Sequence, residues 1–234
     1  MEDVVYILAE ANGTSMEPVS DELVCEGSRL AGKTGGRVCA ALVGGEEGLD
    51  VQPLIRLGAD EVLWMRPDHP DRAVPWDFLT PLHDEIRRAR PKLVLAGVTP
   101  TMRDLLPALA VRLDASLLTN VHFIRLGDGG RVSVTRPFCG GAASAQEESV
   151  EGKTVMVGFP VGVLNVHSGS DTREGTVREI TVATGDPSRP RRVALIPADP
   201  ATVDISDADR IVSVGDGVGG AEPLETVQAL AGAL

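Results

Sequence analysis

Three glycines near the C-terminus have the spacing of a phosphate-binding turn. Gly215, Gly217 and Gly220 form a G-x-G-x-x-G pattern between the apolar run Ile211–Val214 and the apolar-periodic stretch Glu222–Leu234. We expect these flanking segments to be a strand and a helix, which is the context in which the pattern is informative. Glycine backbones turn tightly and let a pyrophosphate reach the free N–H groups of a helix N-terminus. The pattern is therefore typical of the opening of a nucleotide-binding unit.

This unit is incomplete within the sequence. A βαβ unit needs roughly 30 residues or more, and only 221–234 follow Gly220. No second strand follows, and no acidic residue stands about 20 positions further on to hydrogen-bond a ribose. The sequence therefore argues against an NAD-dependent enzyme built on these glycines. We expect the rest of the unit to be supplied by another chain or to be missing.

A second candidate site lies where the expected strand Lys92–Gly97 leads into the expected helix Met102–Leu113. Loops at the carboxyl ends of parallel strands are where open α/β sheets bind ligands. Thr99 and Thr101 could hydrogen-bond an anion there, with Arg103 adding positive charge. The alternative is that Thr101 caps the helix and Arg103 pairs with a neighbouring carboxylate.

The segment from Thr135 to Ala143 combines an arginine and an aromatic residue with paired glycines. Small residues let another backbone approach closely, so we expect Arg136, Gly140 and Gly141 to contact another domain, another subunit or a ligand. Cys139 has no histidine nearby in sequence to activate it as a nucleophile. The four histidines of the chain are scattered and none pairs with another at metal-ligand spacing. We predict no catalytic residue and no metal site.

Composition excludes several classes of partner. The 234 residues carry a formal net charge of −12, which argues against nucleic acid or an anionic membrane as a partner. No apolar run approaches the length of about 18 residues that a membrane-spanning helix needs. Only Glu2 and Asp3 separate Met1 from the first expected strand, so we expect no signal peptide. The three cysteines show no C-x-x-C spacing, which favours reduced core thiols in a cytoplasmic protein.

The first half of the chain alternates expected strands with expected helices. The strands are Val4–Ala9, Arg37–Val43, Glu61–Met65 and Lys92–Gly97, and the helices are Val19–Lys33, Leu49–Leu57, Phe78–Arg90 and Met102–Leu113. Short connections between alternating elements predict an α/β fold, a Rossmann-like, doubly wound, mostly parallel sheet with right-handed crossovers.

The pattern changes after Leu117, where strands and turns follow without a helix. A hairpin is expected from Val121–Leu126 and Arg131–Thr135, followed by strands at Lys153–Val157, Thr176–Ala183 and Arg191–Ile196. We expect these strands to extend the edge of the first sheet by antiparallel pairing.

A proline- and aspartate-rich stretch suggests where the domains divide. Residues 199–209 form the best candidate linker. We therefore expect a Rossmann-like domain over 1–198, the linker over 199–209, and a C-terminal strand-turn-helix remnant over 210–234.

Five segments along the chain occur in an order that resembles the alpha subunit of electron-transfer flavoproteins. They are Leu8–Glu10, Ile55–Val62, Arg103–Leu113, Leu118–Val121 and Arg136–Ala142. In that family, a first Rossmann-like domain packs against a beta subunit and a second domain holds FAD. The resemblance implies a non-catalytic electron-carrier subunit that acts with a beta-type partner. The pair takes electrons from a dehydrogenase donor and passes them to a downstream acceptor.

The resemblance makes Gly215, Asp216, Gly217 and Gly219 the expected cofactor-binding turn. The family's turn typically reads Ser-Gly-Gly-Arg-Gly, and a carboxylate at Asp216 repels a pyrophosphate that an arginine would hold. The short C-terminal part and this charge reversal favour a shortened, altered relative that encloses FAD only with its partner. The alternative is a redox-inactive scaffold, or a nucleotide-binding regulatory module, with the same fold.

Overall fold

The computed structural model of the chain describes residues 4–127, 131–149, 152–186, 190–194, 210–219 and 221–233. The chain divides into two compact units, Met1–Arg192 and Val193–Leu234. The expected linker at 199–209 lies outside the described residues.

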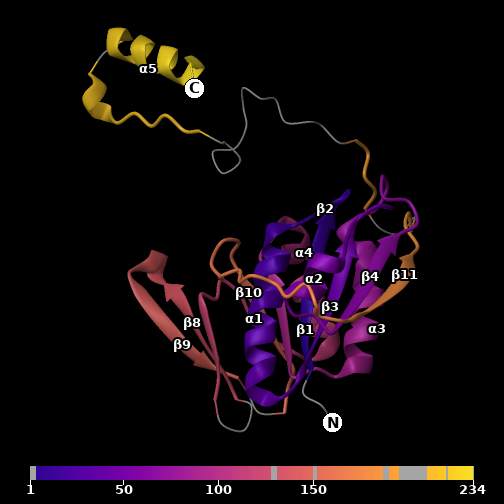
Figure 1. Cartoon of the computed structure of the whole chain (residues 1–234). Helices are drawn as coiled ribbons and strands as arrows, with labels where there is room; N and C mark the ends of the chain where they lie inside the picture. Colours follow the sequence, from indigo (N-terminus) through magenta and orange to yellow (C-terminus); the bar gives the residue numbers. More distant parts are fainter. Residues whose placement is uncertain are drawn as a thin grey trace. The chain divides into compact units, whose positions relative to one another are not determined.

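The larger unit is built on an eight-stranded sheet with the order β11-β4-β3-β1-β5-β10-β6, in which β2 pairs with β1 (Figure 1). All neighbours on this path run parallel, and only the short β2 is antiparallel. The strands are β1 (Val4–Asn12), β2 (Ser15–Met16), β3 (Arg37–Gly44), β4 (Glu61–Pro67), β5 (Leu93–Gly97), β6 (Ser116–Leu118), β10 (Val155–Phe159) and β11 (Thr176–Val182).

Helices cover both faces of this sheet (Figure 1). Successive side chains of a strand point to opposite faces, so Ile7 of β1 joins one apolar cluster and Leu8 joins the other. Helices α1 (Pro18–Thr34) and α2 (Gln52–Leu57) pack on the Ile7 face, and α3 (Leu79–Ala89) and α4 (Pro100–Leu113) on the Leu8 face. The expected α/β doubly wound sheet is confirmed.

One glycine shows how closely a helix approaches the sheet. Gly27 lies inside α1, where glycine weakens a helix, but a Cβ there would come within 2.7 Å of Cδ1 of Ile7. The missing side chain therefore lets α1 lie directly on β1.

The antiparallel strands form a separate sheet. It has the order β7-β8-β9 and consists of β7 (Phe123–Leu126), β8 (Val132–Phe138) and β9 (Ala143–Glu148). The expected hairpin is present as β7 and β8. Ile124 joins the α1-side cluster, and its carbonyl accepts a hydrogen bond of 3.3 Å from Arg29 of α1. This small sheet therefore packs beside α1 and does not extend the main one.

The expectation that the later strands extend the main sheet by antiparallel pairing was wrong. β10 lies between β5 and β6, and β11 lies at the edge beside β4, both in parallel register. All five residues of β10 are buried, as is typical of a parallel strand covered on both faces. No strand is present at 191–194, and Leu195 and Ile196 lie outside the described residues.

The smaller unit contains a 3₁₀ turn at Asp216–Val218 and the helix α5 (Ala221–Ala233), which confirms the expected helix. The strand expected at Ile211–Val214 is absent. A strand is defined by its paired neighbour, and the described residues supply no partner strand to this segment. Among the described helices of both units, none is long and apolar enough to span a membrane.

Candidate functional site

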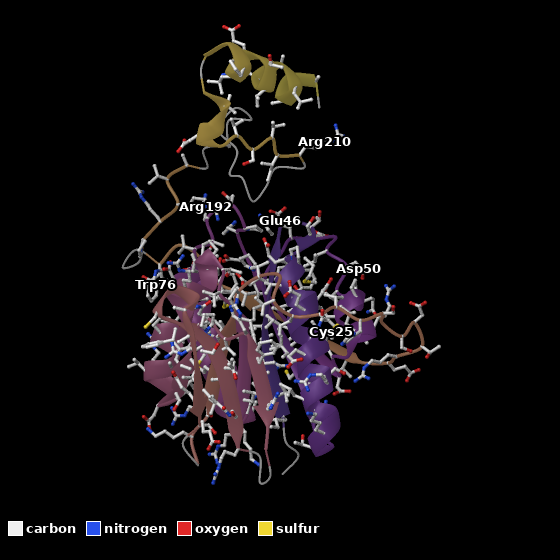
Figure 2. The ribbon with its side chains drawn as sticks, turned by 90° about the vertical axis from the view of Figure 1, so that its left-hand side faces the viewer. Cys25, Glu46, Asp50, Trp76, Arg192 and Arg210 are labelled. Carbon is white, nitrogen blue, oxygen red and sulfur yellow. The ribbon has the colours of Figure 1, made fainter. Side chains whose placement is uncertain are left out.

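The carboxyl ends of β1, β3 and β4 surround a cavity of about 290 Å³. Its wall includes Glu10 at the end of β1, Glu46 after β3, Thr101 of α4 and Arg192. Glu46 and Arg192 are labelled in Figure 2, at the same end of the sheet. Open α/β sheets bind ligands at this position.

Glu10 is the buried acid of this cavity, with only 5% of its surface exposed. Its Oε1 and Oε2 lie 2.7 and 3.0 Å from the hydroxyl of Thr99, which donates to the carboxylate. Burial raises the pKa of the Glu10 carboxyl to about 7, against the hydrogen bond from Thr99. The group therefore changes its charge near neutral pH.

The backbone around Glu10 is fixed by Ser20 of α1. The Glu10 N–H donates to the Ser20 hydroxyl at 2.8 Å, and that hydroxyl donates back to the Glu10 carbonyl at 3.0 Å. Because Ser20 is itself fully buried, the end of β1 is tied to the first turns of α1. The buried carboxyl is thus held in a fixed position at the cavity wall.

Thr99 rather than Thr101 caps α4. The Thr99 Oγ1 accepts a hydrogen bond of 3.1 Å from the N–H of Met102 while it donates to Glu10. The alternative in which Thr101 caps the helix was therefore wrong, because Pro100 occupies the first helical position and the residue before it becomes the cap.

The three residues of the expected anion site lie at one end of the sheet with different surroundings. Thr99 is buried, Thr101 is half-buried at the cavity wall, and Arg103 is exposed. The hydroxyl of Thr99 faces the carboxylate of Glu10. The wall also contains the carboxylates of Glu17 and Glu46, which disfavour an anion. The anion site stays a prediction.

The segment expected to make a contact forms the exposed end of the small sheet. Arg136 on β8 donates to Oε1 of Glu147 on β9 from Nε at 2.9 Å and from Nη2 at 2.6 Å. Gly140 and Gly141 have φ of 65° and 89° in the turn between these strands, and both are exposed. The cross-strand pair thus stiffens an exposed turn whose backbone is open to a partner.

The expected cofactor turn is also open. Gly219 has φ of 67°, a conformation that favours glycine. A Cβ added at Gly215 or Gly217 would meet no atom within 4 Å. Asp216 is exposed as well. Within the described part of its own unit, the turn therefore makes no close approach that requires glycine at Gly215 or Gly217.

Cysteines and possible metal ligands are dispersed. All three cysteines are free: Cys25 is buried, Cys39 is half-buried and Cys139 is exposed. The thiol of Cys139 therefore does not lie in the core, as had been expected for all three. Among the described residues, no three His, Cys, Asp or Glu side chains gather as a metal site.

The sequence interpretation missed the burial of Glu10. The signal was present, since Glu10 directly follows the apolar run Val4–Ala9 at the end of a central strand. A carboxyl in that position points to the ligand-binding edge of a parallel sheet.

The doubly wound sheet, its cavity at the carboxyl edge and the glycine turn define a Rossmann-like α/β protein. The family model described as "Electron transfer flavoprotein domain" matches residues 5–184. The chain therefore belongs to the electron transfer flavoprotein family.

Individual relatives are named as alpha subunits of electron transfer flavoproteins or as FixB proteins. The chain is 26% identical to the electron transfer flavoprotein subunit alpha of Thermoanaerobacterium thermosaccharolyticum, over 98% of this chain and 70% of that protein. It is 30% identical to Protein FixB of Clostridium saccharobutylicum, over 97% of this chain and 68% of the relative. It is 29% identical to the Bacillus subtilis subunit alpha, with the same coverages. The recognition of an alpha-subunit relative is confirmed.

The described residues do not by themselves fit an FAD molecule. From Ile211 to Gly219 the chain is exposed apart from the half-buried Val212 and Val218. The carboxylate of Asp216 adds negative charge in the turn, where a pyrophosphate needs donors. An enclosed flavin site therefore requires atoms beyond those described.

Proposed function

We propose that this chain is an electron-transfer flavoprotein alpha-like subunit that forms a heterodimer with a beta-type partner. The pair passes electrons from a dehydrogenase to a downstream acceptor in the cytoplasm. The observation that carries the proposal is the similarity to alpha subunits and FixB proteins over nearly the whole chain. A carrier of this kind needs no nucleophile or general base of its own.

The residues of the chain serve this role by binding and positioning. FAD, when bound, supplies the electron-transfer chemistry. Gly215, Asp216, Gly217 and Gly219 form the cofactor-proximal turn, and the partner encloses what this open turn leaves exposed. We divide the chain accordingly into a first domain over 1–198, a linker over 199–209 and a cofactor-proximal segment over 210–234.

The beta-type partner contacts the exposed turn of the small sheet. Arg136, Gly140 and Gly141 lie there beside Phe138, whose surface is 57% exposed. Exposed aromatic residues and close backbone approach are both favourable at interfaces. The ion pair between Arg136 and Glu147 reduces the ordering cost of that contact.

Flavin content tests this function. The chain is purified alone and after co-expression with a beta-type electron-transfer flavoprotein subunit, and the flavin-to-protein ratio is measured by absorbance. We expect a flavin-free chain and a yellow, stoichiometrically loaded complex. The beta-type subunit purified alone is the control. A complex without flavin, or a lone chain fully loaded, would contradict the proposal.

The cavity beside Glu10 favours a second candidate function. A ligand cavity at the carboxyl edge of a parallel sheet suits a redox-inactive module that binds a nucleotide. Its anion site is Thr99, Thr101 and Arg103, with the carboxyl of Glu10 protonated and therefore neutral. Titration calorimetry with AMP, ATP and FAD separates the two functions. Binding of AMP or ATP to the lone chain, with a flavin-free complex, supports the second.

A further inference from the structure

A second cavity, of about 230 Å³, lies at the opposite end of the sheet from Glu10. Its wall is built across adjacent strands: Tyr6 of β1 is in register with Cys39 of β3, which is in register with Glu61 of β4. Residues in register share a face of the sheet. Glu85 of α3 and Arg178 of β11 complete the polar part of the wall.

Among the described residues that line this cavity, one positive charge is unmatched. Arg88 pairs with Glu85, which accepts from Arg178 at 2.6 Å, and Nε of Arg178 lies 3.6 Å from Glu61. The positive charges of these two arginines are balanced by the negative charges of the two glutamates. Arg37 also lines the cavity, and it forms no ion pair with any described residue. The balance therefore favours a ligand with a single negative charge.

Tyr6 supplies an unused hydrogen-bond donor. The residue is 1% exposed, and its hydroxyl has no hydrogen-bond partner among the described residues. Burial raises the pKa of this phenol, and the nearby Cys39 and Glu85 raise it further. The hydroxyl therefore stays protonated. Buried polar groups in folded proteins are almost always paired, so this one points to a partner outside the chain.

We propose that this cavity binds a short-chain monocarboxylate, which accepts hydrogen bonds from the hydroxyl of Tyr6 and the guanidinium of Arg37. A planar carboxylate matches the fork of an arginine. The short alkyl group contacts Val4 and Ala89, which form the apolar part of the wall on the face of Tyr6. A doubly charged phosphate exceeds the one unmatched positive charge, and a cation is repelled by Arg37. The site is independent of flavin binding.

The test uses the fact that the chain contains one tyrosine. Labelling tyrosine with ¹³C at Cζ gives the whole chain one tyrosine resonance, which reports on the Tyr6 hydroxyl. The protein is titrated with butyrate, n-butylamine and 1-butanol at constant ionic strength. We expect a saturable shift with butyrate alone. No saturable shift with butyrate, or an equal response to the amine or the alcohol, would overturn the proposal.

Variants locate the binding. Arg37→Gln removes the unmatched charge at an exposed position, and we expect butyrate affinity to fall by about 10-fold or more, as for a lost charged hydrogen bond. Arg87→Gln is the matched control, because Arg87 is exposed on α3 and does not line the cavity. Tyr6→Phe, followed by calorimetry, should weaken binding by about 10-fold. Unchanged affinity in both Arg37→Gln and Tyr6→Phe, or equal losses in Arg37→Gln and Arg87→Gln, would refute the site.

Discussion

Strand β1 has a buried polar side chain near each end, and the two side chains differ in their hydrogen bonding. Tyr6, Leu8 and Glu10 follow one another on the same face of the strand, and all three are buried. At the carboxyl end, Glu10 accepts a hydrogen bond from Thr99. At the amino end, the hydroxyl of Tyr6 has no partner among the described residues. A hydrogen bond offsets part of the cost of burying a polar group, whereas an unpartnered group bears the full cost unless a ligand supplies a partner.

Truncation of Leu8, which lies between Tyr6 and Glu10 on β1, should lower stability more than substitution of either polar side chain. Leu8→Ala removes a side chain with 0% exposure from the cluster that packs under α3 and α4. We expect the free energy of unfolding to fall by about 2–5 kcal/mol, through lost burial and a residual cavity. Urea denaturation measures this. Val111→Ala, at a position 83% exposed, is the control and should change stability little. If Leu8→Ala lowers the free energy of unfolding by less than Val111→Ala does, the two ends of β1 do not share this core.

At the carboxyl end, stability should depend on pH through Glu10. The pKa is raised from its ordinary value of 4.5 to about 7 in the folded chain. The folded state therefore holds the proton more tightly than the unfolded chain. Stability from this group is fully present below about pH 4.5 and is lost as pH rises through about 7.

Glu10→Gln tests this dependence with a neutral side chain of the same shape. We expect the variant to exceed the wild type by about 3 kcal/mol above pH 7, and this difference to vanish towards pH 4.5, since one pKa unit corresponds to about 1.4 kcal/mol. Urea denaturation across this pH range measures the difference. Glu47→Gln, at an exposed position, is the control. A constant difference at all pH values would mean that Glu10 does not titrate in this range.

At the amino end, removing the Tyr6 hydroxyl should raise the stability of the fold, whereas most core substitutions lower it. Tyr6→Phe deletes an unpaired buried hydroxyl and keeps the ring, so we expect stability to rise by about 1–3 kcal/mol in buffer without carboxylates. Thermal or urea unfolding measures the change. A loss of stability would show that the hydroxyl is already satisfied in the free protein.

The sequence predicted the alternating half of the fold well. Runs such as Val4–Ala9 and Arg37–Val43 are apolar and bounded by turn residues, and the structure places strands there. The position of β10 between β5 and β6 could not be predicted in this way, because strand neighbours are chosen by long-range packing. Strand Ala143–Glu148 was missed because it is largely polar, as befits the edge of a small exposed sheet.

The candidate site was predictable only in part. Pro100 at the start of α4 is a sequence signal that the preceding Thr99 is its cap. The burial of Glu10 depends on α1 and α4, which come together only in the folded chain. The same holds for the cavity around Tyr6, whose wall is drawn from residues between Val4 and Arg178. Spacing along the sequence contains no information about such contacts.

At the carboxyl end, Thr99 links the cap of α4 to the carboxyl of Glu10. Thr99→Ala removes both the cap of α4 and the donor to Glu10, and loss of a cap costs about 1 kcal/mol. Because the Thr99 hydrogen bond lowers the Glu10 pKa, its loss should move the pH dependence of stability to higher pH. Thr99→Ser keeps both hydrogen bonds and is the matched control. If Thr99→Ala lowers stability without moving the pH dependence, Thr99 acts on the helix alone, and the carboxyl of Glu10 is as poorly partnered as the hydroxyl of Tyr6.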